Sequence, residues 1–152
     1  MQGLLFPENA KIVTMGELVR LELRALGAHL DGQRVMVGGP EVALPHRSVQ
    51  ILALSLHELA TNARKYGALA TAEGRLAVTW RVTVEGGNRH LALEWRESGV
   101  TPYEKTAPTR KGFGRTLIEE SLPYQLDAKT RLEFGDNDVC CSVLMTLEPG
   151  NG

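Results

Sequence analysis

The spacing of apolar residues divides the chain into segments of helical and of strand character. Thr14 followed by Glu17 has the spacing of a helix-capping box, and apolar residues then recur at the helical period until Gly27. This pattern predicts a first helix over residues 15–28. Between residues 75 and 84, apolar and polar residues alternate strictly, which is typical of a half-buried strand.

The same criteria predict the remaining elements. In chain order they are a short strand over 34–37, a long helix from Pro45 or His46, a second long strand that reaches Glu97 after a Gly86-Gly87-Asn88 turn, a loop over 98–111, a helix over 113–122 ended by Pro123, and a hairpin with strands over 131–134 and 139–147. Strands and helices are mixed without regular alternation. We therefore expect a two-layer α/β sandwich, in which three helices cover one face of a mostly antiparallel mixed sheet.

One face of the long helix carries polar side chains that are suited to binding or catalysis. At about 100° per residue, Glu58, Asn62 and Lys65 fall within a narrow arc, and the apolar residues of the helix point roughly the opposite way. Asn62 is a candidate magnesium ligand, because magnesium prefers oxygen ligands and often takes only one or two from the protein. Lys65 suits contact with a phosphate, and Glu58 suits orienting an acceptor or taking its proton. His57 borders this cluster.

Glu97 is the second candidate for a binding role. It follows Leu91, Leu93 and Trp95 at period two, so its carboxylate is aimed toward the apolar side of the sheet at the end of the strand. Burial of a carboxylate there is costly without a hydrogen-bond donor. We therefore expect a donor to face Glu97.

Composition narrows the class of protein. The 152 residues fit one domain, and 17 basic residues nearly balance 18 acidic ones, which indicates neither nucleic acid nor a membrane surface as a partner. The longest apolar run near the centre, 51–54, is far too short to cross a bilayer, and the N-terminus lacks a signal-peptide pattern, so we expect a cytoplasmic location. Cys140 and Cys141 are adjacent, and we expect both to be packing residues.

Three motifs resemble those of bacterial sensor histidine kinases of the HWE subgroup. The segment 57–67, which includes His57, resembles the N box; Trp95-Arg96-Glu97 matches the Trp-x-Glu mark; and 112–119 resembles the glycine-rich lid of the nucleotide site. They occur in the family's order, and the resemblance runs from about Glu17 to about Leu147. It implies the Bergerat ATP-binding fold, with ATP and Mg²⁺ as cofactors.

The resemblance also assigns roles to residues. It implies catalytic roles for Glu58 and His57, magnesium ligation by Asn62, and a Glu97 carboxylate that accepts a hydrogen bond from the exocyclic amine of adenine. The residues that it places at the nucleotide are Asn62, Lys65, Tyr66, Glu97, Gly99, Gly112, Phe113, Gly114, Arg115, Thr116 and Leu117. In the family the phosphorylated histidine lies on a separate dimerisation helix, so we do not expect His57 to be the acceptor. One departure is that Val100 stands where the family more usually has a Gly-Gly-Pro stretch.

The expected function is therefore the ATP-binding catalytic domain of a sensor histidine kinase. Its expected partners are ATP, the histidine-bearing dimerisation domain of the same kinase and, indirectly, a response regulator. We expect a linker over residues 1–14, the catalytic domain over 15–148 and a tail over 149–152. Two alternatives share the fold: a degenerate docking or phosphotransfer module without nucleotide binding, and a protein-serine kinase of the anti-sigma type.

Overall fold

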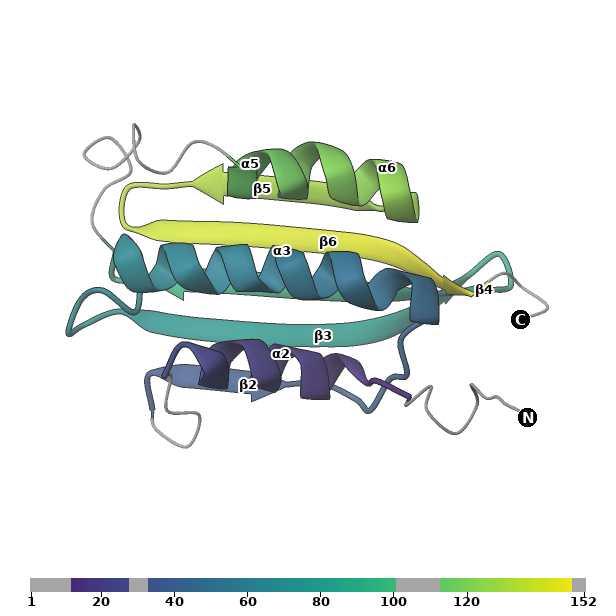
Figure 1. Ribbon diagram of the computed structural model, residues 1–152, viewed down its shortest axis with the longest axis horizontal. Helices are drawn as coiled ribbons and strands as arrows, with labels where there is room; N and C mark the ends of the chain where they lie inside the picture. The colour runs from purple at the N-terminus through teal and green to yellow at the C-terminus, as the bar shows by residue number, and fades with distance from the viewer. Residues whose placement is uncertain (1–11, 28–32, 101–112, 149–152) are drawn as a thin grey trace.

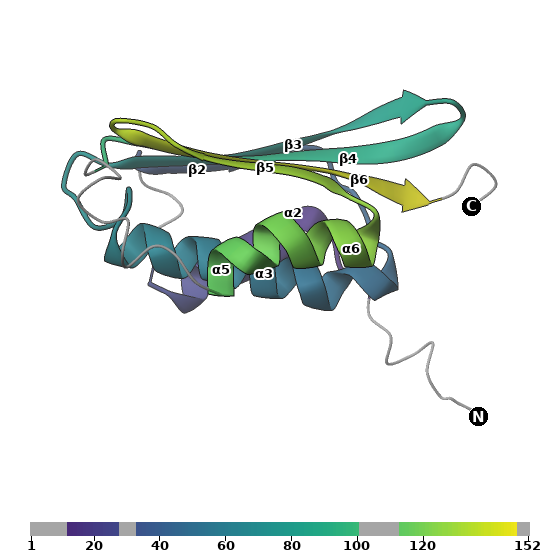
Figure 2. The same cartoon turned by 90° about the horizontal axis from the view of Figure 1, so that it is seen from above.

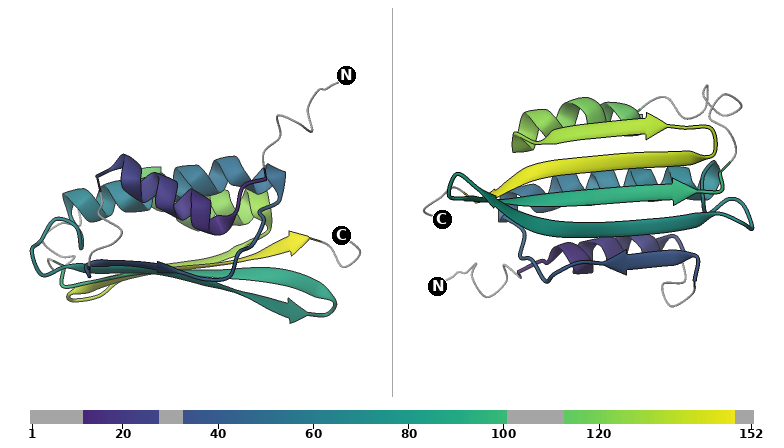
Figure 3. Two further views of the ribbon diagram at one scale, coloured as in Figure 1. Left: turned by 90° about the horizontal axis from the view of Figure 1, so that it is seen from below. Right: turned by 180° about the vertical axis from the view of Figure 1, so that it is seen from behind.

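The chain folds into a sheet and a layer of helices, as the computed structural model shows for residues 12–27, 33–100 and 113–148. All the helices lie on one side of the sheet (Figures 1 and 2). The opposite face of the sheet carries no helix among the described residues (Figure 3). This arrangement confirms the predicted two-layer α/β sandwich.

The sheet has five strands in the order β2-β3-β4-β6-β5. Their bounds are Val35–Gly38 for β2, Arg75–Glu85 for β3, Asn88–Ser98 for β4, Lys129–Phe134 for β5 and Asp138–Glu148 for β6. Only the β2–β3 pair is parallel, so the sheet is mixed and mostly antiparallel, as expected. Gly86 and Gly87 join β3 to β4 with φ angles of 62° and 83°. Such positive φ values at two successive residues suit a tight hairpin turn, and glycine adopts them without steric cost.

The first two helices match their sequence signals. Helix α2, Met15–Ala25, begins with the predicted capping box: the Glu17 N–H donates to Thr14 Oγ1 at 3.2 Å, and the Thr14 N–H donates to Glu17 Oε1 at 3.0 Å. It ends three residues before the predicted limit, because Gly27 takes a φ of 82° that an α-helix does not allow. Helix α3 spans His46–Lys65 and begins directly after Pro45, as predicted.

The third helical segment corrects one prediction. It consists of α5, Phe113–Thr116, a π-helical turn over Leu117–Ser121, and α6, Leu122–Leu126. Pro123 therefore does not end the helix but lies in the first turn of α6, where its missing N–H is tolerated. The π-helical turn makes this possible, because the Leu122 N–H bonds to Leu117 O and a new α-helical stretch begins there. The helix ends instead at Asp127, which has a φ of 53°.

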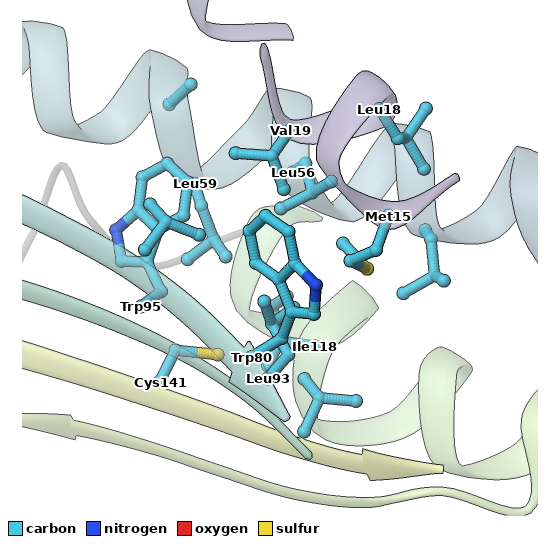
Figure 4. Packing of buried hydrophobic residues seen from close by; sticks show 14 of the residues in the cluster. Met15, Leu18, Val19, Leu56, Leu59, Trp80, Leu93, Trp95, Ile118 and Cys141 are labelled. Atoms are coloured by element: carbon cyan, nitrogen blue, oxygen red, sulfur yellow. The ribbon is translucent and has the colours of Figure 1, made fainter. Parts of the chain in front are cut away.

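The core lies between the two layers. Figure 4 shows Trp80, Leu93, Trp95 and Cys141 pointing from the sheet toward the helices. The labelled residues that the helices contribute are Met15, Leu18, Val19, Leu56, Leu59 and Ile118, all of them buried. Each such side chain stabilises the fold by roughly 1.5–3 kcal/mol through burial.

The two cysteines behave as free thiols, as expected. Cys141 is buried, and burial raises the pKa of its thiol to about 12. Cys140 is half-buried on the other face of β6, and desolvation also raises its pKa. A raised pKa keeps a thiol protonated and unreactive near neutral pH, which supports a packing role.

Candidate functional site

A small, fairly enclosed pocket lies where α3, the third helical segment and the strands β4, β5 and β6 meet. Its described lining residues are Glu58, Leu59, Asn62, Glu97, Arg115, Ile118, Leu132, Phe134 and Val139. Four of these were singled out in the sequence for chemistry, and they come from three separate elements. The fold thus brings Glu58 and Asn62 of α3, Glu97 of β4 and Arg115 of α5 to one pocket, which the apolar residues complete.

Glu97 is the most constrained polar residue of this pocket. Only 2% of its surface is exposed, although it is a carboxylate. The Ala68 N–H donates to Oε1 at 3.0 Å, and the Trp95 indole N–H donates to Oε2 at 2.8 Å. These two donors, one on each carboxylate oxygen, fix the orientation of the Glu97 side chain. This confirms that donors meet Glu97 at the end of the strand.

The hydrogen bond between Trp95 and Glu97 explains the spacing of the Trp-x-Glu motif. Residues two apart on a strand share a face, so Trp95 and Glu97 both point into the pocket side of β4. From the sequence, Trp95 was expected as an apolar residue on the face of Glu97 and as part of the Trp-x-Glu mark, but its role as a donor to Glu97 was not predicted. The period-two spacing contained that information, because a buried indole N–H usually finds a partner. The Ala68 N–H had no sequence signal, because any residue at that position offers the same backbone group.

Glu58 and Asn62 lie one turn apart on α3, and both are half-buried. The helix buries Ile51 and Ser55 on the same side, so the polar arc flanks the core and does not oppose it. The sequence predicted a polar face opposite the core. The structure instead places Asn62 at the edge of the core, where it lines the pocket together with Leu59 and Ile118.

Arg115 closes the pocket from the side of α5. Its Nε donates to Glu119 Oε1 at 3.1 Å, one turn along the same helical segment. Its guanidinium carbon also lies 5.4 Å from the centre of the Phe134 ring. Among the described lining residues, Arg115 is the basic one, and it shares the pocket with the acidic Glu58 and Glu97.

The other residues that were predicted to contact the nucleotide differ in position and in exposure. Lys65, the last residue of α3, is exposed, and Tyr66 after it is half-buried; neither lines the pocket as described. Thr116 is exposed, whereas Leu117 is 3% exposed and belongs to the core. Phe113 and Gly114 supply the first backbone turn of α5. Gly112 lies outside the described residues.

His57 lies away from the pocket. Its Nδ1 is 3.3 Å from Glu22 Oε1 on α2, and 47% of its side chain is exposed. The structure therefore does not bring His57 into the described pocket with Glu58. The contact instead joins α3 to α2, on the flank of the helix that does not line the pocket.

The turn after Glu97 is held in place despite its departure from the family pattern. Gly99 has a φ of 71°, and its carbonyl accepts a hydrogen bond from Thr71 Oγ1 at 2.9 Å. The Val100 side chain is 3% exposed, and its N–H and C=O pair with Asn137 at 3.0 and 3.1 Å. Val100 therefore serves as an apolar anchor for the turn.

Comparison with known proteins agrees with these motifs. No family model matches the chain. A blue-light-activated histidine kinase of Brucella anthropi is 38% identical to it over 116 residues, which are 76% of this chain and 23% of that protein. The chain belongs to the HWE-type histidine kinase catalytic domains. It spans about a quarter of the length of the curated relatives that it matches.

Solved histidine kinase domains share the fold. The histidine kinase domain of the blue-light-activated histidine kinase of Erythrobacter litoralis has a TM-score of 0.64 at 20% identity, covering 89% of this chain and 62% of that one. A nucleotide-free catalytic domain of the histidine kinase ThkA has a TM-score of 0.59 at 13% identity, covering 90% and 96%. In this histidine kinase domain, no helix of the described residues is long and apolar enough to span a bilayer.

Proposed function

We propose that this chain binds ATP together with magnesium and transfers the γ-phosphoryl group to a histidine on a separate dimerisation domain of the same kinase. One observation carries the proposal: a buried carboxylate, Glu97, is held by two N–H donors in the pocket that Asn62 and Glu58 also line. An arrangement that only stabilised the fold would gain little from burying a charge. The membership of the chain in the histidine kinase catalytic domains supports the same function.

At the base end of the site, Glu97 acts as an acceptor for the exocyclic amine of adenine. Guanine has a carbonyl at that ring position, which would set two acceptors against each other. Leu59, Ile118 and Val139 supply apolar walls for a flat base. The pocket therefore favours adenine over guanine.

At the phosphate end, Asn62 offers a carboxamide oxygen to the cation. Among the described residues no group of three or more His, Cys, Asp or Glu is arranged to hold a metal ion. This fits magnesium, which commonly takes only one or two protein oxygens and completes its shell with phosphate and water. Bound Mg-ATP supplies the reactive phosphoryl group and neutralises its developing charge. Arg115, which also lines the pocket, would balance further phosphate charge.

Glu58 then acts on the acceptor. As the bond from the γ-phosphorus to the ADP oxygen breaks, a bond to an imidazole nitrogen of the acceptor forms, and Glu58 orients that ring or takes its proton. A response regulator would receive the phosphoryl group afterwards. Because ATP is the donor, we propose a cytoplasmic location.

The test is calorimetric titration of the chain with ATP and with GTP, each with and without magnesium. We expect ATP binding that strengthens with magnesium, and a preference over GTP of about 1–3 kcal/mol, the usual cost of an unsatisfied buried polar group. Absence of nucleotide binding would favour the docking module instead. Equal affinities for the two nucleotides would show that Glu97 does not read the base.

A further inference from the structure

Arg34 holds the loop that supplies a donor to Glu97. It immediately precedes β2, and its carbonyl accepts the Leu76 N–H of β3 at 2.8 Å, so its backbone is fixed to the sheet. Its half-buried side chain turns toward the loop between α3 and β3. There the guanidinium donates to three backbone carbonyls: Nε to Gly74 at 3.1 Å, and Nη2 to Ala68 at 2.9 Å and to Thr71.

The same loop forms hydrogen bonds with Glu97, near the end of β4, and with Gly99, just after β4. The Ala68 N–H donates to Glu97 Oε1, and Thr71 Oγ1 donates to the Gly99 carbonyl. Ala68 and Thr71 therefore each bond to Arg34 through their carbonyl and to the Glu97–Gly99 segment through a donor. No carboxylate among the described residues forms an ion pair with Arg34. Its contacts thus go to the loop and not to a neighbouring acid.

We propose that Arg34 is a positioning residue for nucleotide recognition, which acts through the loop of residues 66–74 to hold the Glu97 carboxylate in its base-reading orientation. This inference rests on the proposed function. The rigid fork of a guanidinium carries five N–H donors, and three carbonyls at different points of one loop match that geometry. A lysine ammonium is a single compact centre and cannot span the same three acceptors.

The experiment compares Arg34→Gln with Arg81→Gln in the 152-residue chain. Arg81 is an exposed arginine on β3, so its variant controls for loss of charge. Affinities for Mg-ATP and Mg-GTP are measured by calorimetry. We expect the preference for ATP over GTP to fall about tenfold in Arg34→Gln, as for loss of a charged-group hydrogen bond, and to stay at the wild-type value in Arg81→Gln. An unchanged preference in Arg34→Gln would overturn the inference while leaving the proposed function intact.

A second readout needs no nucleotide. Amide hydrogen exchange, followed by NMR, reports on the Ala68 N–H that bonds to Glu97, and we expect it to exchange about tenfold faster in Arg34→Gln than in wild type. Unchanged protection would contradict the link between Arg34 and Glu97, whatever the nucleotide data show. If circular dichroism shows Arg34→Gln to be unfolded, Arg34→Lys takes its place with the same expectations. Unfolding of both variants would assign Arg34 a purely structural role and overturn the proposal.

Discussion

The two tryptophans of this chain each donate an indole hydrogen bond, but to different partners. Trp95 Nε1 donates to the Glu97 carboxylate at 2.8 Å, and Trp80 Nε1 donates to the Pro40 carbonyl at 2.7 Å. Both rings are buried in the same core. The pair therefore provides a matched comparison between a bond inside the pocket and one outside it.

We predict that Trp95→Phe lowers the free energy of unfolding by about 1–3 kcal/mol, because it removes a donor from the buried Glu97 carboxylate. Trp80→Phe should lower it by less, because the Pro40 carbonyl belongs to an exposed residue and can bond to water instead. Only Trp95→Phe should also reduce the preference for ATP over GTP, by about tenfold, since only Trp95 orients Glu97. Urea unfolding and calorimetry measure the two effects. Equal nucleotide preferences in the two variants would show that the indole does not position the carboxylate.

Asn62 gives a second prediction at the scale of a residue. In Asn62→Ala, the increase in ATP affinity that magnesium causes should disappear, because the carboxamide oxygen is lost. The fold should remain, since alanine is the better helix former and the side chain lies on the flank of the core. Gln50→Ala, which removes an exposed carboxamide from the same helix, is the control. A magnesium effect of wild-type size in Asn62→Ala would exclude Asn62 as the ligand.

At the scale of elements, the loop between α3 and β3 is closed tightly on itself. A Cβ added to Gly74 would lie 1.9 Å from the Ala68 carbonyl oxygen, which is a backbone atom and cannot rotate away. The same oxygen accepts the Arg34 hydrogen bond. The loop therefore requires glycine at this position for space and not for a positive φ.

We predict that Gly74→Ala destabilises the fold by about 1–3 kcal/mol, the usual cost of overpacking a filled site, and weakens ATP binding because the Ala68 N–H moves away from Glu97. Gly38→Ala is the matched control, because a Cβ there meets no atom within 4 Å. Urea unfolding of the two variants and titration with ATP test this expectation. A Gly74→Ala variant as stable as Gly38→Ala would contradict the inference that the loop leaves no space for a side chain at residue 74.

At the scale of the whole molecule, the described part of the chain places no histidine in the lining of the pocket. Among the described histidines, His46 and His57 are exposed, His90 is half-buried, and none lines the pocket. His57 faces Glu22 on α2. Under the proposed function, the acceptor histidine belongs to a separate dimerisation domain.

We predict that the chain, incubated alone with γ-labelled ATP, forms no stable phosphohistidine, and that it phosphorylates an added histidine-bearing dimerisation domain of the same kinase. Acid-labile label on each partner is the measurement. Label retained on this chain, and lost in His57→Ala with ATP binding preserved, would overturn both the site and the need for a second domain. Label on serine in the added domain would favour the serine-kinase alternative.

The sequence by itself determined most of the elements and much of the candidate site. The alternating strands, the capped first helix and the hairpin turns all depend on local spacing and local backbone preferences. The motif order around Asn62, Glu97 and Arg115 likewise pointed to one site, and the fold brings these three residues into one pocket.

Only the tertiary structure decided the rest, because the decisive partners are distant in sequence or belong to the backbone. The continuation of the third helix through Pro123 depends on a π-helical turn that the proline pattern does not encode. The direction of His57 depends on where α2 packs against α3. The link from Arg34 to Glu97 runs through carbonyl and amide groups that every residue carries, so no pattern of side chains could reveal it.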